Sequence, residues 1–324
     1  MLTNKLHLPE PFYQAALKRL YSKGPARYSV TELIDPARLG ALKRLYDKVI
    51  VEDIADNIAS LMGTLFHKML QDAGAGTTGA ILEERLYAEV DGTLISGAMD
   101  HVLLKPDGTL TDYKTCKVYA VLLHKRYGKH DWIAQTNIYR YLQALHGRTV
   151  DSLKIVPWMK DWDLGRAIAS AEKGGDYPEH EIVELDVPVW SLEDTERYIK
   201  ERIAAHVEAD RWAASLNDTL TQVDEQDIEP LCTDEERWRD KHYYVVMSPK
   251  RKSAHPGKYD TEGEARYAAT QVKDGYVAER GGLYKRCLLY CPVGRAGLCS
   301  QWERDKAATP TAGFIDTSAF DESP

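Results

Sequence analysis

Three β-type segments in close succession most restrict the folds available to this chain. They cover residues 85–90, 94–104 and 109–115. Asp91–Gly92 joins the first two, and an Asp-Gly pair between such segments is a strong signal for a tight hairpin. The turn-forming Pro-Asp-Gly at 106–108 joins the second segment to the third. The sequence therefore predicts an antiparallel three-stranded meander.

Helical patterns flank these strands. Apolar residues at spacings of three and four predict an amphipathic helix over 49–72, and residues 131–146 form a second helical segment with Asp131 as its expected cap. Residues 152–157 and 181–187 are further strand-like segments. The order of helix, three strands, helix and strand predicts an α/β protein with a central mixed sheet flanked by helices.

The composition changes along the chain and predicts five regions. These are an N-terminal helical segment at 1–48, the α/β core at 49–190, an acidic helix and linker at 191–236, a small cysteine-containing C-terminal unit at 237–303, and a disordered tail at 304–324.

The overall composition is that of an ordinary globular protein. Of the 324 residues, 44% are hydrophobic and 28% are charged. No apolar run approaches the roughly 18 residues that a membrane span needs, and the first residues lack the apolar stretch of a secretory signal. We therefore expect a cytoplasmic protein with reduced cysteines and no membrane partner.

The net charge of −8 is unevenly distributed. Residues 181–236 carry 17 acidic and 4 basic side chains, a local net charge of −13, which leaves +5 for the rest. Residues 113–130 and 241–258 each hold five Lys or Arg and no acid. Such runs are often only solvated surface, but phosphate binding responds to local charge rather than to the net value. The candidate DNA contacts in the first run are Lys117, Lys125 and Arg126.

Two carboxylates and a lysine are expected to meet within the meander. Asp100 lies in the second strand, and Asp112 and Lys114 lie two apart in the third, so that the latter two face the same side. Clustered carboxylates favour a compensating cation, and hard oxygen ligands favour Mg²⁺ or Mn²⁺. Taken alone, the pattern is also what two ordinary strand-end aspartates and a salt-bridged lysine would give.

Two further pairs accompany this constellation on the predicted helices. Gly63 and His67 precede it as GxxxH, and Gln135 and Tyr139 follow it as QxxxY. Residues four apart share a helical face, so each pair is expected to present both members together.

The ordered motifs GxxxH, GxxD (ending at Asp100), DxK (Asp112 and Lys114) and QxxxY resemble those of RecB-like nucleases of the PD-(D/E)XK superfamily. That group includes nucleases of recombination, of phages and of CRISPR systems. The resemblance spans roughly residues 29–145 and implies a restriction-endonuclease-like core. Its implied metal ligands and supporting groups are His67, Asp100, Asp112, the carbonyl of Tyr113, Gln135 and Tyr139, with Lys114 as catalytic lysine and Glu89 as an auxiliary acid.

Four cysteines lie in the C-terminal half. Cys287, Cys291 and Cys299 form a compact C-x₃-C-x₇-C motif, and Cys232 stands apart. Several RecB-like nucleases hold an iron–sulfur cluster on one upstream cysteine and three grouped ones, and thiolates also suit zinc. In those relatives the lone cysteine precedes the GxxxH helix, whereas here that stretch has none and Cys232 would have to serve. Both a four-cysteine metal site and unmetallated thiols remain open.

The sequence as a whole predicts a metal-dependent deoxyribonuclease, an exonuclease or end-processing enzyme of recombination, repair or phage DNA metabolism. The alternatives are a structure-specific endonuclease and a catalytically idle DNA-binding or assembly module. The chain has no Walker A pattern. Any ATP-driven unwinding would therefore come from a partner such as a helicase or recombinase.

Overall fold

The computed structural model describes residues 2–17, 22–76, 79–103, 108–216, 229–251 and 253–308. The chain divides into two compact units. One comprises Met1–Gly40 with Val51–Asp227, and the other comprises Ala41–Ile50 with Ile228–Pro324. Residues 106–107 of the predicted turn, residues 217–228 of the predicted linker and residues 309–324 of the predicted tail lie outside the described residues.

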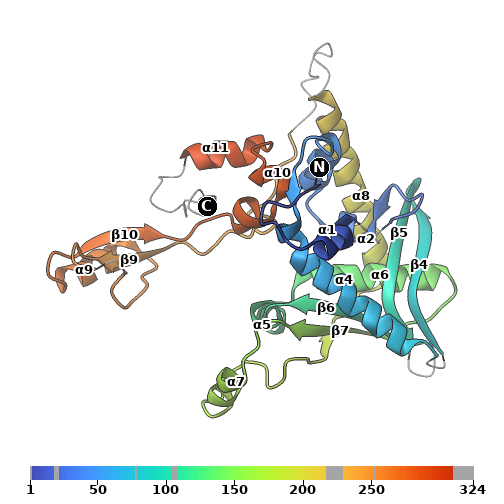
Figure 1. Cartoon of the computed structure of the whole chain (residues 1–324), viewed down its shortest axis with the longest axis horizontal. Coiled ribbons are helices and arrows are strands. Elements are labelled where there is room, and N and C mark those ends of the chain that lie inside the picture. Colours follow the sequence, from blue (N-terminus) through green and yellow to red (C-terminus); the bar gives the residue numbers. More distant parts are fainter. Residues whose placement is uncertain are drawn as a thin grey trace. The chain divides into compact units, whose positions relative to one another are not determined.

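A long hairpin forms one side of the first unit's sheet (Figure 1). Strands β4 (Ala80–Val90) and β5 (Thr93–Leu103) pair antiparallel along their length. At the turn, Asp91 and Gly92 have φ of +50° and +70°, as a tight primed turn requires. Strand β6 (Thr109–Cys116) is antiparallel to β5, so the predicted meander is confirmed.

Further pairings make the sheet mixed. Strand β7 (Ser152–Met159) runs parallel to β6 along the whole of both strands, and β8 (Leu185–Val187) is antiparallel to β7. The short β2 (Tyr28–Ser29) lies parallel to the start of β5. The prediction of a central mixed sheet flanked by helices is confirmed.

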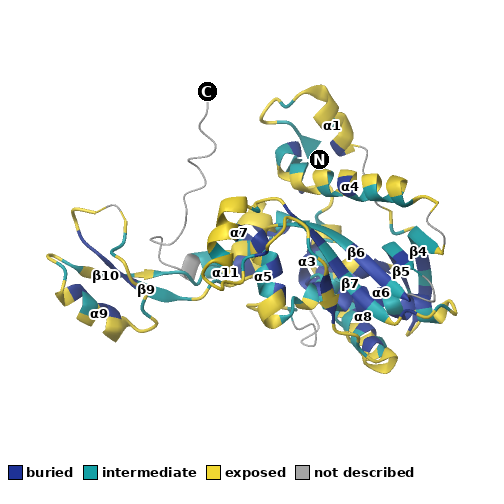
Figure 2. Ribbon diagram, turned by 90° about the horizontal axis from the view of Figure 1, so that it is seen from below, coloured by how far each residue is buried: buried dark blue, intermediate teal, exposed yellow. Residues whose placement is uncertain are grey.

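Helices cover both faces of this sheet. Figure 2 shows α4 (Ile54–Gly74) on one side of the strands, and α6 (His130–Leu145) and α8 (Leu192–Ser215) on the other. Asp53 caps α4 by accepting the N–H of Ala55. The expected cap of α6 is wrong, because Lys129 is its N-cap residue and Asp131 lies inside the first turn. There the negative charge of Asp131 still favours the positive end of the helix dipole.

Short elements complete the first part of the chain. They are β1 (Leu2–Thr3), α1 (Glu10–Leu17), α2 (Val30–Ile34), α3 (Ala37–Leu45), β3 (Glu52–Asp53), α5 (Val118–Tyr127) and α7 (Leu164–Ala171). The main core lies between the sheet and its helices, and includes Ile95, Met99, Leu110, Ile138 and Leu142.

The second unit contains a two-stranded antiparallel sheet of β9 (Tyr243–Met247) and β10 (Tyr276–Arg280), with α9 (Glu262–Thr270) against it. A π-helical turn η1 (Arg286–Tyr290) and helices α10 (Pro292–Arg295) and α11 (Ser300–Ala308) follow. Helix α11 thus extends into the predicted tail, and the part of that tail beyond residue 308 lies outside the described residues.

Among the described residues, no helix combines the length and apolar character that crossing a membrane requires.

Gly97→Ala should destabilise the first unit. A Cβ at Gly97 would lie 2.8 Å from the ring of Tyr139 and 2.9 Å from Leu142, so β5 and α6 would have to separate. Overpacking of this kind costs about 1–3 kcal/mol, which urea unfolding would measure. The matched control is Gly165→Ala, because a Cβ there meets only the Asp163 side chain, at 3.3 Å. Equal stability of both variants would contradict this close packing.

Candidate metal-dependent active site

The candidate site lies where β5 and β6 separate. Their ladder ends at the pair His101–Thr111, and the next residues along the two strands are Asp100 and Asp112. Here the Asp100 carboxylate accepts the N–H of Tyr113 at 2.7 Å. A side chain thus satisfies a backbone donor that the ladder leaves free, and the opening admits side chains from neighbouring elements.

His67 from α4 meets two carboxylates at this opening. Its Nδ1 lies 3.1 Å from Asp100 Oδ1 and 3.9 Å from Glu83 Oε1. One ligand atom of each of these three residues lies within 4.8 Å of the other two. Within the described residues, this is the one group of His, Cys, Asp or Glu side chains gathered closely enough to share an ion.

Glu83 occupies the place that the sequence analysis gave to Glu89. Glu89 pairs with Leu94 near the hairpin turn and is exposed, so the structure does not bring it to the cluster. Glu83 lies between the pairs Leu82–His101 and Glu84–Met99, and so across from Asp100. The two-residue turn fixes that register, but the predicted strand at 85–90 is too short to include Glu83, because β4 begins at Ala80. Its φ of +50° is an unusual conformation for a non-glycine residue in a strand.

Asp112 and Lys114 form an ion pair next to this cluster. Lys114 Nζ lies 2.6 Å from Asp112 Oδ2, as expected for residues two apart on one strand. Asp112 is only 2% exposed. Despite the short distance, no donor among the described residues reaches Asp112 Oδ2 with the geometry of a hydrogen bond. This buried oxygen therefore keeps capacity for a further partner.

Helix α6 fixes Lys114 from the other face of the sheet. Lys114 Nζ donates to Gln135 Oε1 at 2.8 Å, and Gln135 Nε2 donates to the hydroxyl of Tyr139 at 2.9 Å. Gln135 and Tyr139 are both buried. The QxxxY pair therefore positions the lysine in this structure, through one helical turn.

The glycines of the first two motifs allow this convergence. A Cβ on Gly63 would lie 3.2 Å from Thr115 Oγ1, which is tighter than ordinary contact, so α4 approaches β6 closely where His67 follows one turn later. Gly97 makes room for Tyr139 in the same way. Both glycines serve close packing at the site.

Three ionisable groups of the site, Glu83, Asp112 and His67, have raised pKa values. Burial raises the pKa of Glu83, and the charge of Asp100 raises it further. Burial also raises the pKa of Asp112 to about 6, with the charge of Lys114 opposing this shift and that of Asp100 adding to it. Burial lowers the pKa of His67, but the hydrogen bond and charge of Asp100 outweigh it and the net shift is upward. These directions indicate more negative charge than Lys114 alone offsets.

This arrangement fits a divalent cation. The gathered imidazole and carboxylates are metal ligands that such ions use. The buried Asp112 Oδ2, which has no hydrogen bond, is a further oxygen that could ligate the ion. Carboxylates suit Mg²⁺ and Mn²⁺ alike, whereas the imidazole is a ligand that the strictly oxygen-preferring Mg²⁺ uses less readily.

The three cations predicted to contact DNA lie on or beside α5, which begins shortly after Lys114. Lys117 is the N-cap residue of α5, and Lys125 and Arg126 lie in its last turn. All three are exposed, and Arg126 forms an ion pair with Asp176 at 2.5 Å. Their DNA contacts stay predictions.

The cysteines of the C-x₃-C-x₇-C motif lie close together in the second unit. Cys287 is on η1, and Cys291 Sγ accepts the N–H of Gly294 at 3.3 Å. Burial, and to a smaller extent the neighbouring thiols of Cys287 and Cys299, raise the pKa of Cys291.

Cys232 is tied to the same part of the chain by Gln301. The N–H of Cys232 donates to Gln301 Oε1 at 3.0 Å, and Gln301 Nε2 donates to the carbonyl of Cys232 at 2.9 Å. Within the described residues, however, no three cysteine sulfurs lie within 4.8 Å of one another. Tetrahedral zinc would need them closer, since each Zn–S bond is about 2.3 Å.

Comparisons with known proteins identify no family for this chain. No family model matches it, and no curated protein matches it. Solved structures of similar fold include SSO0001, at 16% identity and TM-score 0.41 over 60% of this chain and 83% of that one. A phage-related exonuclease from Haemophilus somnus 129PT has 16% identity and a TM-score of 0.39, and the match covers 61% of this chain and 98% of that one. The alkaline exonuclease LHK-Exo from Laribacter hongkongensis has 14% identity and a TM-score of 0.33, and the match covers 58% of this chain and 93% of that one. These values are too low to establish a function.

Glu83→Gln should weaken the binding of Mn²⁺ by at least about tenfold, because it removes a charge from the gathered ligand set. Calorimetric titration of the full chain would measure the affinity. Glu89→Gln is the matched control, since it makes the same change six residues along the same strand at an exposed position. Equal affinities for the two variants would show that Glu83 is not a ligand.

Proposed function

We propose that the first unit is a metal-dependent DNA nuclease that hydrolyses phosphodiester bonds. The observation that carries this proposal is the convergence at one strand opening of His67, Glu83 and Asp100 with the ion pair of buried Asp112 and half-buried Lys114. A non-catalytic module would have no need of a lysine held by both a buried aspartate and a buried glutamine.

His67, Glu83 and Asp100 would hold the cation together with Asp112, and the carbonyl of Tyr113 is the remaining ligand that the family resemblance implies. A divalent cation bound there would polarise the phosphoryl oxygen and activate water. Mg²⁺ and Mn²⁺ are the candidate ions, with Mn²⁺ favoured by the imidazole.

Lys114 is the proposed catalytic lysine, and the side chains around it define both its charge and its position. Burial lowers the pKa of Lys114, but the charges of Asp112 and Asp100 outweigh burial, so the pKa is raised and the amine stays protonated. Asp112 and Gln135 fix the position of Nζ. A fixed positive charge there would orient the attacking water and offset the negative charge that develops on the phosphate.

DNA is the proposed substrate because a run of cations that contains no acid follows the site in sequence, and Lys117 and Lys125 of this run are exposed. Residues 113–130 hold five Lys or Arg and no Asp or Glu. We propose exonuclease or end-processing activity, in keeping with the motif resemblance. A structure-specific endonuclease is the alternative of the same class, and a helicase or recombinase remains the proposed partner.

Lys114→Ala should lower the rate of DNA cleavage by at least about 100-fold while leaving DNA binding largely intact. The change removes charge stabilisation at the phosphate but no proposed metal ligand. Purified protein would be assayed on linear duplex, single-stranded and closed circular DNA with Mg²⁺, Mn²⁺ or EDTA. Loss of linear DNA with circles spared indicates an exonuclease, and cutting of circles indicates an endonuclease.

Lys154→Ala provides the control for this assay. Lys154 is on β7 and forms an ion pair with Glu184 at 2.5 Å, outside the site. This variant should cut at the normal rate. Normal cleavage by Lys114→Ala would refute the catalytic assignment, and no cleavage by the unaltered protein, with binding retained, would favour an idle module.

We further propose that the C-terminal cysteines hold a metal that stabilises the second unit. An iron–sulfur cluster is the first candidate, and zinc is an alternative that would require the sulfurs to move closer together. Burial raises the pKa of Cys287, and the hydrogen bond and charge of the buried Arg237 oppose this shift. Arg237 would therefore help to stabilise a metal-bound thiolate there. Cys232 is the proposed fourth ligand.

Ligation by these cysteines predicts that anaerobically purified protein contains about one equivalent of cluster or zinc, and that Cys287→Ser loses it. Elemental analysis and visible absorption would measure the content. Cys116→Ser is the control, because burial raises the pKa of this thiol to about 11 and it lies on β6 in the other unit. Finding neither iron nor zinc would remove this proposal and leave the nuclease proposal unaffected.

A further inference from the structure

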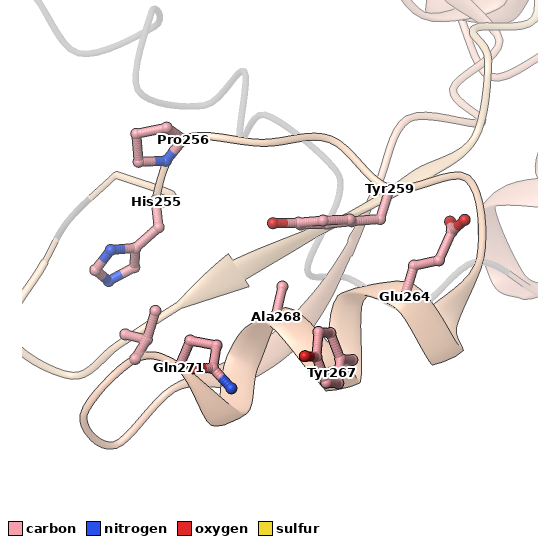
Figure 3. Close-up of a pocket in the computed structure, with 8 residues that line it drawn as sticks. His255, Pro256, Tyr259, Glu264, Tyr267, Ala268 and Gln271 are labelled. Carbon is pink, nitrogen blue, oxygen red and sulfur yellow. The ribbon is translucent and has the colours of Figure 1, made fainter.

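The β9–α9–β10 module of the second unit contains an open pocket of about 680 Å³ (Figure 3). Its lining comes from the chain segment after β9 and from helix α9. The residues used below are His255, Tyr259, Glu264, Tyr267 and Gln271. This volume is within the range of roughly 300–1,000 Å³ typical of ligand pockets.

The wall of this pocket is preformed. Tyr259 and Tyr244 exchange backbone hydrogen bonds of 2.8 and 2.9 Å, and the N–H of His255 donates to the carbonyl of Val246 at 2.8 Å. Gly257 has a φ of +115°, and a Cβ there would lie 2.7 Å from the Tyr259 hydroxyl. The absence of a side chain at Gly257 therefore lets the Tyr259 ring lie along the segment. Because this wall is already ordered, a ligand would lose little binding free energy to ordering it.

Two aromatic rings line the pocket. Figure 3 shows the ring of Tyr259 above α9 and that of Tyr267 projecting from the helix. Tyr267 is 74% exposed, although it is a large aromatic residue. Gln271 and Glu264 add an amide and a carboxylate, which can hydrogen-bond to polar atoms at the edge of an aromatic ligand.

Two cations lie near the pocket without lining it. Arg251 Nη1 lies 3.4 Å from Nδ1 of the pocket residue His255. The exposed Lys258 precedes Tyr259 in the chain, and its Nζ lies 4.5 Å from the centroid of the Tyr243 ring. Neither Lys250 nor Arg251 has an acidic partner among the residues that the structure describes. Residues 241–280 contain eight Lys and Arg against five Asp and Glu, in a chain whose net charge is −8.

We propose that this pocket binds a nucleobase of single-stranded nucleic acid. The base stacks on Tyr259 and Tyr267, and the adjoining phosphates contact Arg251 and Lys258. Aromatic faces with a basic rim are the combination by which proteins hold single strands without strict sequence preference. A peptide ligand would not explain the excess of cations around an aromatic pocket. The site supplies a strand-binding function beyond the proposed catalysis.

Fluorescence anisotropy of the full chain with a labelled oligothymidylate, in EDTA, tests this proposal. Combined Tyr259→Ala and Tyr267→Ala substitutions should weaken binding about tenfold or more, because each base–aromatic stack contributes substantially. Tyr259→Phe with Tyr267→Phe keeps both rings and should retain binding. Tyr276→Ala is the matched control, since Tyr276 is an exposed tyrosine of the same module that does not line the pocket.

The phosphate-binding cations have a separate readout. Arg251→Ala with Lys258→Ala should lower the slope of log affinity against log salt by about 0.7 for each phosphate that the protein no longer neutralises. Unchanged affinity of the double alanine variant, as expected if the pocket takes a peptide, overturns the proposal, and so does an equal loss in the phenylalanine variant. Cleavage has no part in this measurement. A protein that binds the strand through the pocket but never cuts DNA would contradict the nuclease proposal alone.

Discussion

The buried Asp112 forms an ion pair with the half-buried Lys114 on the central strand β6, and neighbouring elements are arranged to satisfy it. A buried pair costs free energy unless its remaining polar atoms find partners, and removing one partner leaves an uncompensated charge. Gln135 accepts from Lys114, and Tyr139 accepts from Gln135. Tyr139 in turn fits only because Gly97 has no side chain. A chain of contacts thus connects three of the four sequence motifs, with the ion pair at one end and a glycine at the other.

The ion pair leaves the opposite side of the opening negatively charged. Glu83 and Asp100 approach His67 from the paired strands β4 and β5, and Asp112 keeps a buried oxygen without a hydrogen bond. Burial raises the pKa of Glu83 and of Asp112, and the charge of Asp100 adds to both shifts. The backbone of Glu83 has a positive φ, which is strained for a non-glycine residue. Strain of this kind is found at functional sites, and the Glu83 side chain is one of the three gathered at this opening.

Local sequence signals are sufficient for a large part of this arrangement. The Asp91–Gly92 turn and alternating strands predict the meander, and the i, i+4 spacing places Gln135 beside Tyr139. The same turn also determines that Glu83 lies opposite Asp100. The expectation for Glu89 did not take the strand register into account. Glu89 pairs with Leu94 beside the turn and is therefore far along the hairpin from Asp100. The register alone does not identify Glu83, because the predicted strand begins at residue 85 whereas β4 begins at Ala80.

Other features depend on contacts between distant segments, which local patterns do not specify. The residues of β7 are recognisable as a strand, but their parallel pairing with β6 depends on the path of the chain through α5 and α6. The separation of β5 from β6 after three residue pairs has no turn or glycine signal of its own. At this separation His67 from one helical layer reaches Asp100 on β5, and Gln135 from the other layer reaches Lys114 on β6. The candidate site and the interruption in the sheet therefore lie at the same place, and both depend on contacts between segments that are distant in sequence.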